Sequence, residues 1–247
     1  MINKKLFTNK TRNTFIIVLS IFVILVIAGF IMLKYDVYGE KNLPFELSKI
    51  NIISSAKEET VKDENENWKM KILQNNDLYF YIDKNTKNKK NLVIEKVTFD
   101  NFNFTSNTNL DEINVYKPTD DVIVYKYNEE YESDLIEYKG SKVTNRKFME
   151  INNQGGMVQF SIANINLGEY LIDQEQTLSS DGLLLNLINA GYEDIKFSVS
   201  FDMTIAVENG NTYKANIKLD LPVGDITQEG VSTLEITDFK DIAFKRI

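Results

Sequence analysis

Hydrophobic and polar positions divide the chain into two regions with different periodicities. Residues 14–33, TFIIVLSIFVILVIAGFIML, form an apolar run of twenty residues without a charged side chain. At about 1.5 Å per residue, a helix of this length covers the roughly 30 Å of a bilayer's hydrocarbon core. The pattern predicts one N-terminal transmembrane helix, with a short tail at residues 1–13 before it and a juxtamembrane linker at residues 34–44 after it.

Residues 45–247 show the alternation of apolar and polar positions that is typical of strands with one buried face. The clearest strand is predicted over residues 195–207, where every odd position is apolar, and its return strand over residues 213–221. Shorter strands are predicted at residues 47–55, 68–73, 78–83, 92–104, 122–127, 135–138, 147–151, 157–162, 233–237 and 242–245. Regularly spaced short strands indicate one all-β domain, built as a β-sandwich.

Turn residues predict how these strands connect. Residues 57–67 are interpreted as a charged loop, residues 74–77 (Gln-Asn-Asn-Asp) as a hairpin turn and residues 152–156 as a second hairpin loop. One short helix is predicted at residues 181–190, capped by the aspartate at its start and closed by Gly191 in the left-handed conformation.

The long hairpin has a predicted register. Placing Val207 opposite Tyr213 keeps the apolar residues of both strands on one face. This pairing requires a three-residue loop over residues 209–211, with Asn211 in the left-handed conformation.

Charges around the apolar run predict its orientation. Four basic residues and no acidic ones precede it, against three scattered lysines after it: Lys4, Lys5, Lys10 and Arg12 before, and Lys34, Lys41 and Lys49 after. The positive-inside rule then places the N-terminus in the cytoplasm and residues 34–247 outside the cell membrane.

The alternative to a membrane anchor is a cleaved secretory signal. An uncleaved anchor is favoured because signal apolar regions span 7–15 residues and end in a small-x-small cleavage site.

Composition narrows the chemistry of the domain. The chain has 28 basic and 36 acidic residues, and removing the four N-terminal basic residues leaves 24 against 36, a net charge of −12. Such a surface repels nucleic acid and favours basic partners. The chain contains neither Cys nor His. Disulfides, imidazole-dependent catalysis and the usual zinc sites are therefore excluded.

Several short segments carry a resemblance to a known family. They are residues 43–50 (LPFELSKI), 74–79 (QNNDLY), 153–156 (NQGG) and 219–224 (LDLPVG). Together with the apolar N-terminal run, the chain resembles an uncharacterised family of single-pass, membrane-anchored extracytoplasmic proteins of low-GC Gram-positive, clostridia-like bacteria. The resemblance implies a location and brings no activity, cofactor or site residue with it.

Two motifs suggest chemistry that the rest of the sequence does not support. Residues 54–57 (Ser-Ser-Ala-Lys) match the S-x-x-K pattern of penicillin-recognising enzymes, but the S-D-N and K-T-G motifs of that class are absent. Residues 63–67 (Asp-Glu-Asn-Glu-Asn) resemble the start of a calcium loop. Trp68 stands where such a loop needs glycine, and Gln74 where it needs glutamate, so a solvated acidic loop is the better interpretation.

Carboxylates and tyrosines give two further candidates. The pair Asp120-Asp121 and the cluster at residues 129–132 (Glu-Glu-Tyr-Glu) offer carboxylates for glycoside hydrolysis, although adjacent acids are expected by chance in so acidic a chain. Two rows of tyrosines, Tyr79 with Tyr81 and Tyr125 with Tyr127 and Tyr131, suit either sugar stacking or ordinary cross-strand packing, and packing is favoured.

The sequence therefore predicts a membrane-tethered, non-enzymatic interaction or scaffold protein of the bacterial envelope. It predicts no catalytic, cofactor-binding or metal-binding residues. The expected partners are the lipid bilayer, through residues 14–33, and an envelope protein. The alternatives are a module that binds cell-wall glycan and a carboxylate-dependent hydrolase.

Overall fold

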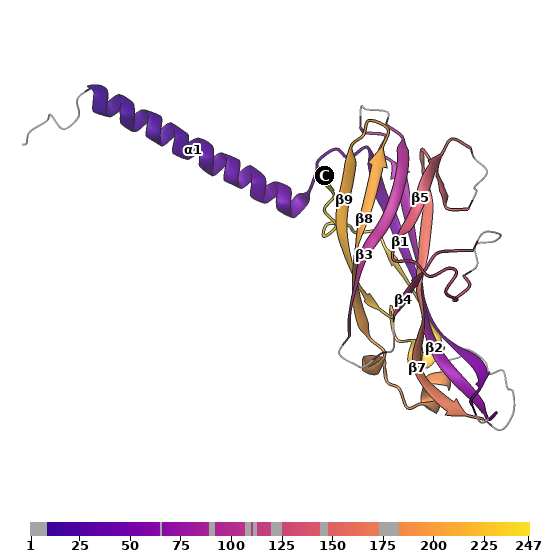
Figure 1. Cartoon of the computed structure of the whole chain (residues 1–247). Helices are drawn as coiled ribbons and strands as arrows, with labels where there is room; N and C mark the ends of the chain where they lie inside the picture. Colours follow the sequence, from indigo (N-terminus) through magenta and orange to yellow (C-terminus); the bar gives the residue numbers. More distant parts are fainter. Residues whose placement is uncertain are drawn as a thin grey trace, which may run out of the picture.

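A long helix projects from an elongated β domain (Figure 1). The computed structural model of the chain describes residues 9–64, 66–88, 92–106, 110, 113–119, 125–143, 148–172 and 183–247. Helix α1 (Asn9–Tyr38) extends beyond the predicted span at both ends and includes the first part of the predicted linker. Its apolar part is long enough to cross a membrane, and no other part of the chain that the structure describes buries it. This confirms a single N-terminal helix with the length and composition of a membrane span.

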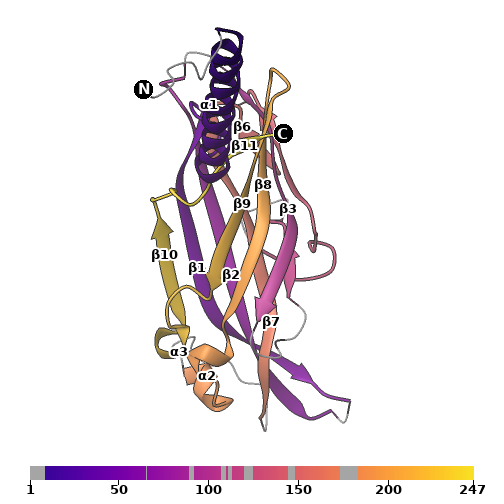
Figure 2. The same cartoon turned by 90° about the vertical axis from the view of Figure 1, so that its left-hand side faces the viewer.

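Two sheets form the β domain, as Figure 2 shows. The first has the order β10-β1-β2-β7-β4, with bounds Val231–Ile236, Phe45–Lys62, Trp68–Lys84, Gly155–Leu171 and Asn114–Tyr116. The second has the order β11-β9-β8-β3-β5-β6, with bounds Lys245–Arg246, Thr212–Leu221, Phe197–Val207, Ile94–Ser106, Ile136–Ser141 and Glu150–Asn152. Among these neighbours only β5 and β6 run parallel. The predicted all-β, sandwich-like domain is confirmed.

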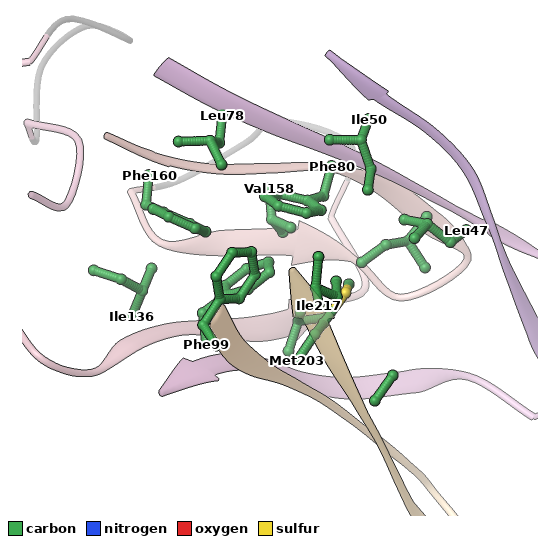
Figure 3. Close-up of a cluster of buried hydrophobic side chains, with 14 of the residues drawn as sticks. Leu47, Ile50, Leu78, Phe80, Phe99, Ile136, Val158, Phe160, Met203 and Ile217 are labelled. Carbon is green, nitrogen blue, oxygen red and sulfur yellow. The ribbon is translucent and has the colours of Figure 1, made fainter. Parts of the chain in front are cut away.

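Aromatic side chains from both sheets fill the centre of the sandwich (Figure 3). Phe80 and Phe160 from the first sheet contact Phe99 and Phe201 from the second, with ring centroids 4.8–6.0 Å apart. Each of the four side chains is fully buried. Alternation along the strands makes this core possible, because every second side chain points to the same face.

The first two strands are much longer than the sequence predicts. Residues 57–62, predicted as part of a charged loop, continue β1, and only residues 63–67 turn the chain into β2. Residues 74–77 do not form a hairpin turn. They lie in the middle of β2, where Gln74 pairs with Ala56 and Asp77 with Ile53. The loop prediction is wrong for residues 57–62 and right for residues 63–67, and the turn prediction at residues 74–77 is wrong, because polar residues typical of turns here continue paired strands.

The β8–β9 hairpin has a different register from the predicted one. Ile205 lies opposite Tyr213, and the backbone N–H of Val207 donates to the Asn211 carbonyl at 3.0 Å. The loop is therefore residues 208–210, with Gly210 rather than Asn211 in the left-handed conformation, at φ +79°. Gly210 takes this position at no steric cost because it lacks a Cβ. The two-residue shift keeps the apolar residues on one face, as predicted.

Two other local predictions were wrong in detail. Residues 152–156 do not join hairpin partners, because β6 belongs to the second sheet and β7 to the first. The chain crosses there between the two layers. Helix α2 (Leu183–Leu187) is shorter than predicted, and the left-handed residue after it is Asn189, since Gly191 has φ −89°. The proposed cap at position 181 lies outside the described residues.

Two further connections contain short helical turns. The 3-10 turn η1 (Tyr192–Asp194) leads into β8, and α3 (Ile226–Glu229) leads into β10. Asp225 caps α3 by accepting a hydrogen bond from the Thr227 backbone N–H at 2.9 Å. Of the strand predicted at residues 122–127, positions 125–127 have no regular structure and the rest lies outside the described residues.

Candidate functional site

The polar residues in the middle of β2 form a candidate site on both faces of the first sheet. On the inner face, Ser54, Gln74 and Asn76 are fully buried. The Ser54 hydroxyl donates to Asn76 Oδ1 at 2.7 Å and accepts from the Val223 backbone N–H at 2.9 Å. Asn76 Nδ2 donates to the Ile162 carbonyl at 3.2 Å. These bonds offset the cost of burying Ser54 and Asn76, whereas Gln74 Oε1 has no hydrogen-bond partner among the described residues.

The layer separates two hydrophobic clusters. On one side lies the main core of the sandwich. On the other lies a smaller cluster, which we call the distal cluster: Ala56, Met70, Ile72, Leu184, Leu185, Ile195 and Ile226. The side chains of the distal cluster come from β1 and β2, from the two short helices α2 and α3, and from the residue just after η1.

On the outer face, Asp77 lies among hydroxyl groups. The Tyr127 hydroxyl donates to Asp77 Oδ1 at 3.3 Å, and Ser161 donates to the neighbouring Asn76 carbonyl at 3.1 Å. Burial raises the pKa of Asp77, and Ser161, the charge of Lys57 and the Tyr127 hydroxyl hold it back only in part. Asp77 is thus a partly buried carboxylate with a raised pKa, a feature that also occurs at functional sites.

Tyrosines close over this carboxylate. Burial raises the pKa of Tyr79 to about 12, and it raises the pKa values of Tyr125 and Tyr127, with the Asp77 charge adding to each shift. The Tyr125 and Tyr127 rings stack at 6.1 Å between centroids, and the Tyr116 ring meets Tyr127 edge-on at 5.3 Å. The second tyrosine row therefore packs against itself, as the favoured interpretation predicts.

Two buried polar atoms near Asp77 lack a hydrogen-bond partner among the described residues. They are the Tyr125 hydroxyl and Gln159 Oε1. Unpaired buried polar atoms are costly in a folded protein. The site therefore combines one carboxylate, several hydroxyls and one cation, Lys57. Within the described residues it contains no second carboxylate among the groups that shift the pKa of Asp77.

The S-x-x-K motif has no catalytic geometry here. Ser54 is fully buried and its hydroxyl is engaged on both sides, whereas Lys57 is exposed. A separation of three residues places two side chains on opposite faces of a strand. The two side chains therefore cannot act together.

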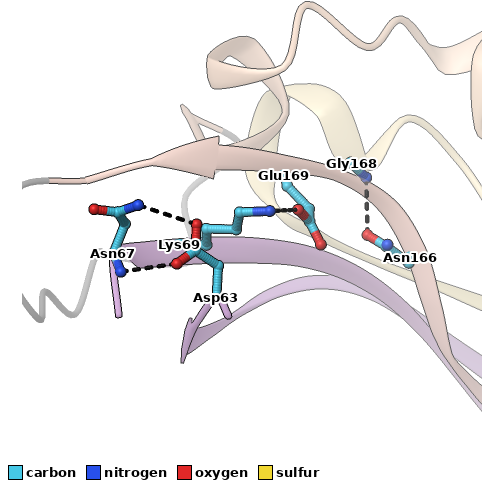
Figure 4. A network of polar contacts seen from close by, with 6 residues as sticks. All are labelled: Asp63, Asn67, Lys69, Asn166, Gly168 and Glu169. Carbon is cyan, nitrogen blue, oxygen red and sulfur yellow. Dashed lines mark hydrogen bonds and ion pairs between the residues drawn. The ribbon is translucent and has the colours of Figure 1, made fainter. Parts of the chain in front are cut away.

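The acidic segment at residues 63–67 forms the turn between β1 and β2 (Figure 4). Asp63 accepts hydrogen bonds from the backbone N–H and the side-chain amide of Asn67, at 2.8 and 3.2 Å. Next to it, Lys69 pairs with Glu169 at 2.9 Å across β2 and β7. No group of three or more acidic side chains arranged to hold a metal ion occurs among the described residues. Asp63 thus stabilises the turn between β1 and β2.

Of the predicted carboxylate clusters, only residues 129–132 lie among the described residues. Glu129 and Glu130 lie exposed in a turn, and Glu132 follows on an isolated bridge to Tyr116. Asp120 and Asp121 lie outside the described residues. Tyr79 and Tyr81 share the outer face of β2, as predicted, and the Lys49 ammonium lies 4.5 Å from the centroid of the Tyr81 ring.

Sequence reasoning missed Asn76 and Asp77 because the polar run at residues 74–77 predicts a turn, and it gave no role to Ser161, which lies in the strand predicted at residues 157–162. A signal was present. Even positions stay on one face from Met70 to Ile82, so Gln74 and Asn76 continue an unbroken alternation.

The chain matches no protein-family model, no curated protein and no solved structure. The resemblance to an uncharacterised membrane-anchored family therefore stays a prediction. A function for this chain has to be argued from the geometry of its own residues.

Proposed function

We propose that the chain is a membrane-tethered, non-enzymatic interaction or scaffold protein of the bacterial envelope. In this proposal its N-terminus is cytoplasmic and its β domain lies outside the cell membrane. Support comes from the apolar helix α1, from the basic residues that precede it, and from the acidic domain that follows it.

The observation that carries the interaction role is the edge of the first sheet. Strand β10 ends the sheet order, and no described strand pairs with its outer edge (Figure 2). Val231 and Leu234 are 46% and 43% exposed on it. Leu234 lies opposite Ile52 and so belongs to the core-facing side of the sheet, yet the second sheet leaves it partly uncovered.

An uncovered edge strand of this kind accepts another strand through backbone hydrogen bonds. A segment that adds to β10 would pair with its free backbone groups and cover Leu234. Exposed Glu235 on β10, which also pairs with Lys49 at 3.5 Å, and exposed Glu229 at the end of α3 favour a partner segment with basic side chains. The occupant we propose is an extended, basic segment of another envelope protein.

Site-specific photo-crosslinking tests this role. A photoreactive amino acid at exposed Thr233 on β10, in cells expressing the full chain, is expected to yield a discrete adduct with another protein. The matched control is the same probe at exposed Lys218 on β9. The variant Leu234→Lys places a charge on the edge and is expected to abolish the Thr233 adduct while leaving the fold intact. Adducts of equal yield from both positions, or none from Thr233, would contradict the proposal.

Cysteine labelling tests the orientation, since the natural chain has no cysteine. A membrane-impermeant maleimide added to intact cells is expected to label Glu64→Cys in the exposed β1–β2 turn and to leave Lys10→Cys unlabelled until the cells are lysed. The reverse result would place the domain in the cytoplasm.

A further inference from the structure

Helix α1 is joined firmly to the last strand of the domain. The Glu40 backbone N–H donates to the Phe244 carbonyl at 2.6 Å, and the Arg246 backbone N–H donates to the Tyr35 hydroxyl at 3.0 Å. Lys245 pairs with Asp36 at 3.0 Å. Gly39 has φ +68°, and a Cβ there would lie 2.4 Å from the Phe244 carbonyl oxygen. The chain therefore enters the domain through a close backbone contact that glycine permits.

This junction lies at the depth of lipid headgroups if α1 spans a bilayer. The apolar run ends at Leu33, and the helix continues for five residues to Tyr38. Five residues add about 7.5 Å, which is roughly the thickness of one headgroup layer. The end of the sandwich next to α1 is thus held against the membrane surface (Figures 1 and 2).

A hollow at this end of the sandwich brings together three cations from distant parts of the sequence. Lys41 follows α1, Lys87 lies in the turn after β2, and Arg246 lies in β11. Their side chains are exposed, and none pairs with a carboxylate among the described residues. Glu40 is the one acidic residue that lines the hollow. This surface is therefore locally positive on a domain that is strongly acidic.

Hydrogen bonds fix the segments that carry these cations. The Asn85 backbone N–H donates to the Pro44 carbonyl at 3.0 Å, and Asn85 Nδ2 donates to the Leu43 carbonyl at 2.9 Å. The Asn88 side chain donates to the Asn42 carbonyl. The Lys87 turn and the Lys41 segment are thus joined. Asn42, Asn88 and Asn211 also line the hollow and add amide groups, which can donate to phosphate oxygens.

We propose that Lys41, Lys87 and Arg246 bind the phosphate groups of anionic lipid headgroups in the leaflet where α1 ends. The inference rests on α1 spanning the bilayer, but it does not depend on the proposed partner of β10. Unpaired cations held at the membrane surface attract anionic lipids even when the rest of the domain is acidic. The lipid contacts would then hold the domain at the membrane surface together with the helix.

The test uses the full chain in nanodiscs of phosphatidylcholine with phosphatidylglycerol. Electron spin resonance of spin-labelled lipids measures the preference of the protein's lipid shell for phosphatidylglycerol over phosphatidylcholine. The variant K41Q/K87Q/R246Q is expected to lose this preference by about fivefold or more. Raising the salt concentration is expected to reduce the wild-type preference, because exposed charges are screened.

Two matched variants separate this site from general charge. K62Q/K126Q/K218Q removes three exposed lysines elsewhere and is expected to keep the wild-type preference. K41R/K87R/R246K keeps the charges and is expected to retain it as well. The proposal is overturned if K41Q/K87Q/R246Q keeps the wild-type preference for phosphatidylglycerol, or if K62Q/K126Q/K218Q loses as much of it. Abolition of the preference by millimolar inorganic phosphate would assign the hollow to a soluble phosphate ligand instead of a lipid. The crosslinking result at Thr233 is independent of all these outcomes.

Discussion

The main core and the distal cluster use the same strands but differ in what covers them. In the main core, β1 and β2 face a second sheet, and four phenylalanine rings meet at the centre. In the distal cluster, the buried residues that cover the same two strands within the described part of the chain come from α2, α3 and Ile195. Figure 2 shows these helices at the end of the domain away from α1. Short helices offer few residues for burial, so we infer that the distal cluster is the less stable end of the molecule.

The largest effect is expected in the main core. Phe80→Ala removes a ring that contacts Phe99, Phe160 and Phe201, and it is expected to lower the free energy of unfolding by about 3–5 kcal/mol. Urea unfolding of the full chain in detergent micelles measures it. Because the core packs both sheets together, the urea midpoints followed by far-UV circular dichroism and by Trp68 fluorescence should fall together. The control Phe148→Ala, at a 37% exposed site, should change the free energy of unfolding little. A similar loss in both variants would contradict the difference in packing.

A smaller and more local effect is expected in the distal cluster. Leu184→Ala is expected to cost about 2–4 kcal/mol, because its side chain is fully buried between α2 and the strands. Trp68 begins β2 next to this cluster, where its carbonyl accepts from the Ile172 backbone N–H at 3.1 Å. Its fluorescence should therefore change at lower urea than the circular dichroism. Coincident transitions would show that the two clusters unfold as one unit. Leu135→Ala, 52% exposed, is the control.

A substitution in the polar layer between the clusters should lower the free energy of unfolding by less than either of these. Asn76→Ala leaves the Ser54 hydroxyl without its acceptor and the Ile162 carbonyl without its side-chain donor, and is expected to cost about 1–3 kcal/mol. Since Asn76 contacts both sides, both spectroscopic probes should shift by the same amount. Asn186→Ala, exposed in α2, is the control. A shift confined to Trp68 fluorescence would assign Asn76 to the distal cluster alone.

Sequence patterns predicted the main core better than the distal cluster, and the reason is physical. Alternation over residues 195–207 identifies the buried face of β8, because burial against a second sheet requires every second residue to be apolar. Near the distal cluster, the buried Asn76 side chain bonds to groups far away in sequence: its Oδ1 accepts from the Ser54 hydroxyl, and its Nδ2 donates to the Ile162 carbonyl. A sequence pattern carries no information on such partners, so buried polar residues were assigned to a turn.

The candidate site was missed for the same reason. Asp77 and Ser161 are separated by more than eighty residues and meet only because β2 pairs with β7, where they lie opposite each other. The hollow near α1 also depends on tertiary contacts, since Lys41, Lys87 and Arg246 belong to three segments. The membrane helix, in contrast, was predictable because length and composition alone determine whether a helix can span a bilayer.

The smallest effect concerns the outer face of β2. Burial raises the pKa of Asp77 above its unfolded value of about 3.9, so the folded chain holds this proton more tightly. The resulting stability is fully present below the unfolded pKa and is lost as the pH rises through the folded pKa. The free energy of unfolding of the wild type, relative to Asp77→Asn, is therefore expected to fall as the pH rises from about 3.9.

Asp225 provides a control of opposite sign at the start of α3. Hydrogen bonds from the Thr227 hydroxyl and backbone N–H lower its pKa, so its contribution to stability is present above the unfolded pKa and is lost as the pH falls. Urea titrations at several pH values should give slopes of opposite sign for Asp77→Asn and Asp225→Asn, each relative to the wild type. A slope parallel to that of Asp225→Asn would mean that the pKa of Asp77 is lowered in the folded chain, and a slope of zero would mean that Asp77 is solvated when folded. If Asp77 is solvated, water reaches the outer face of β2 in spite of the tyrosines. This face is then an ordinary solvated sheet surface.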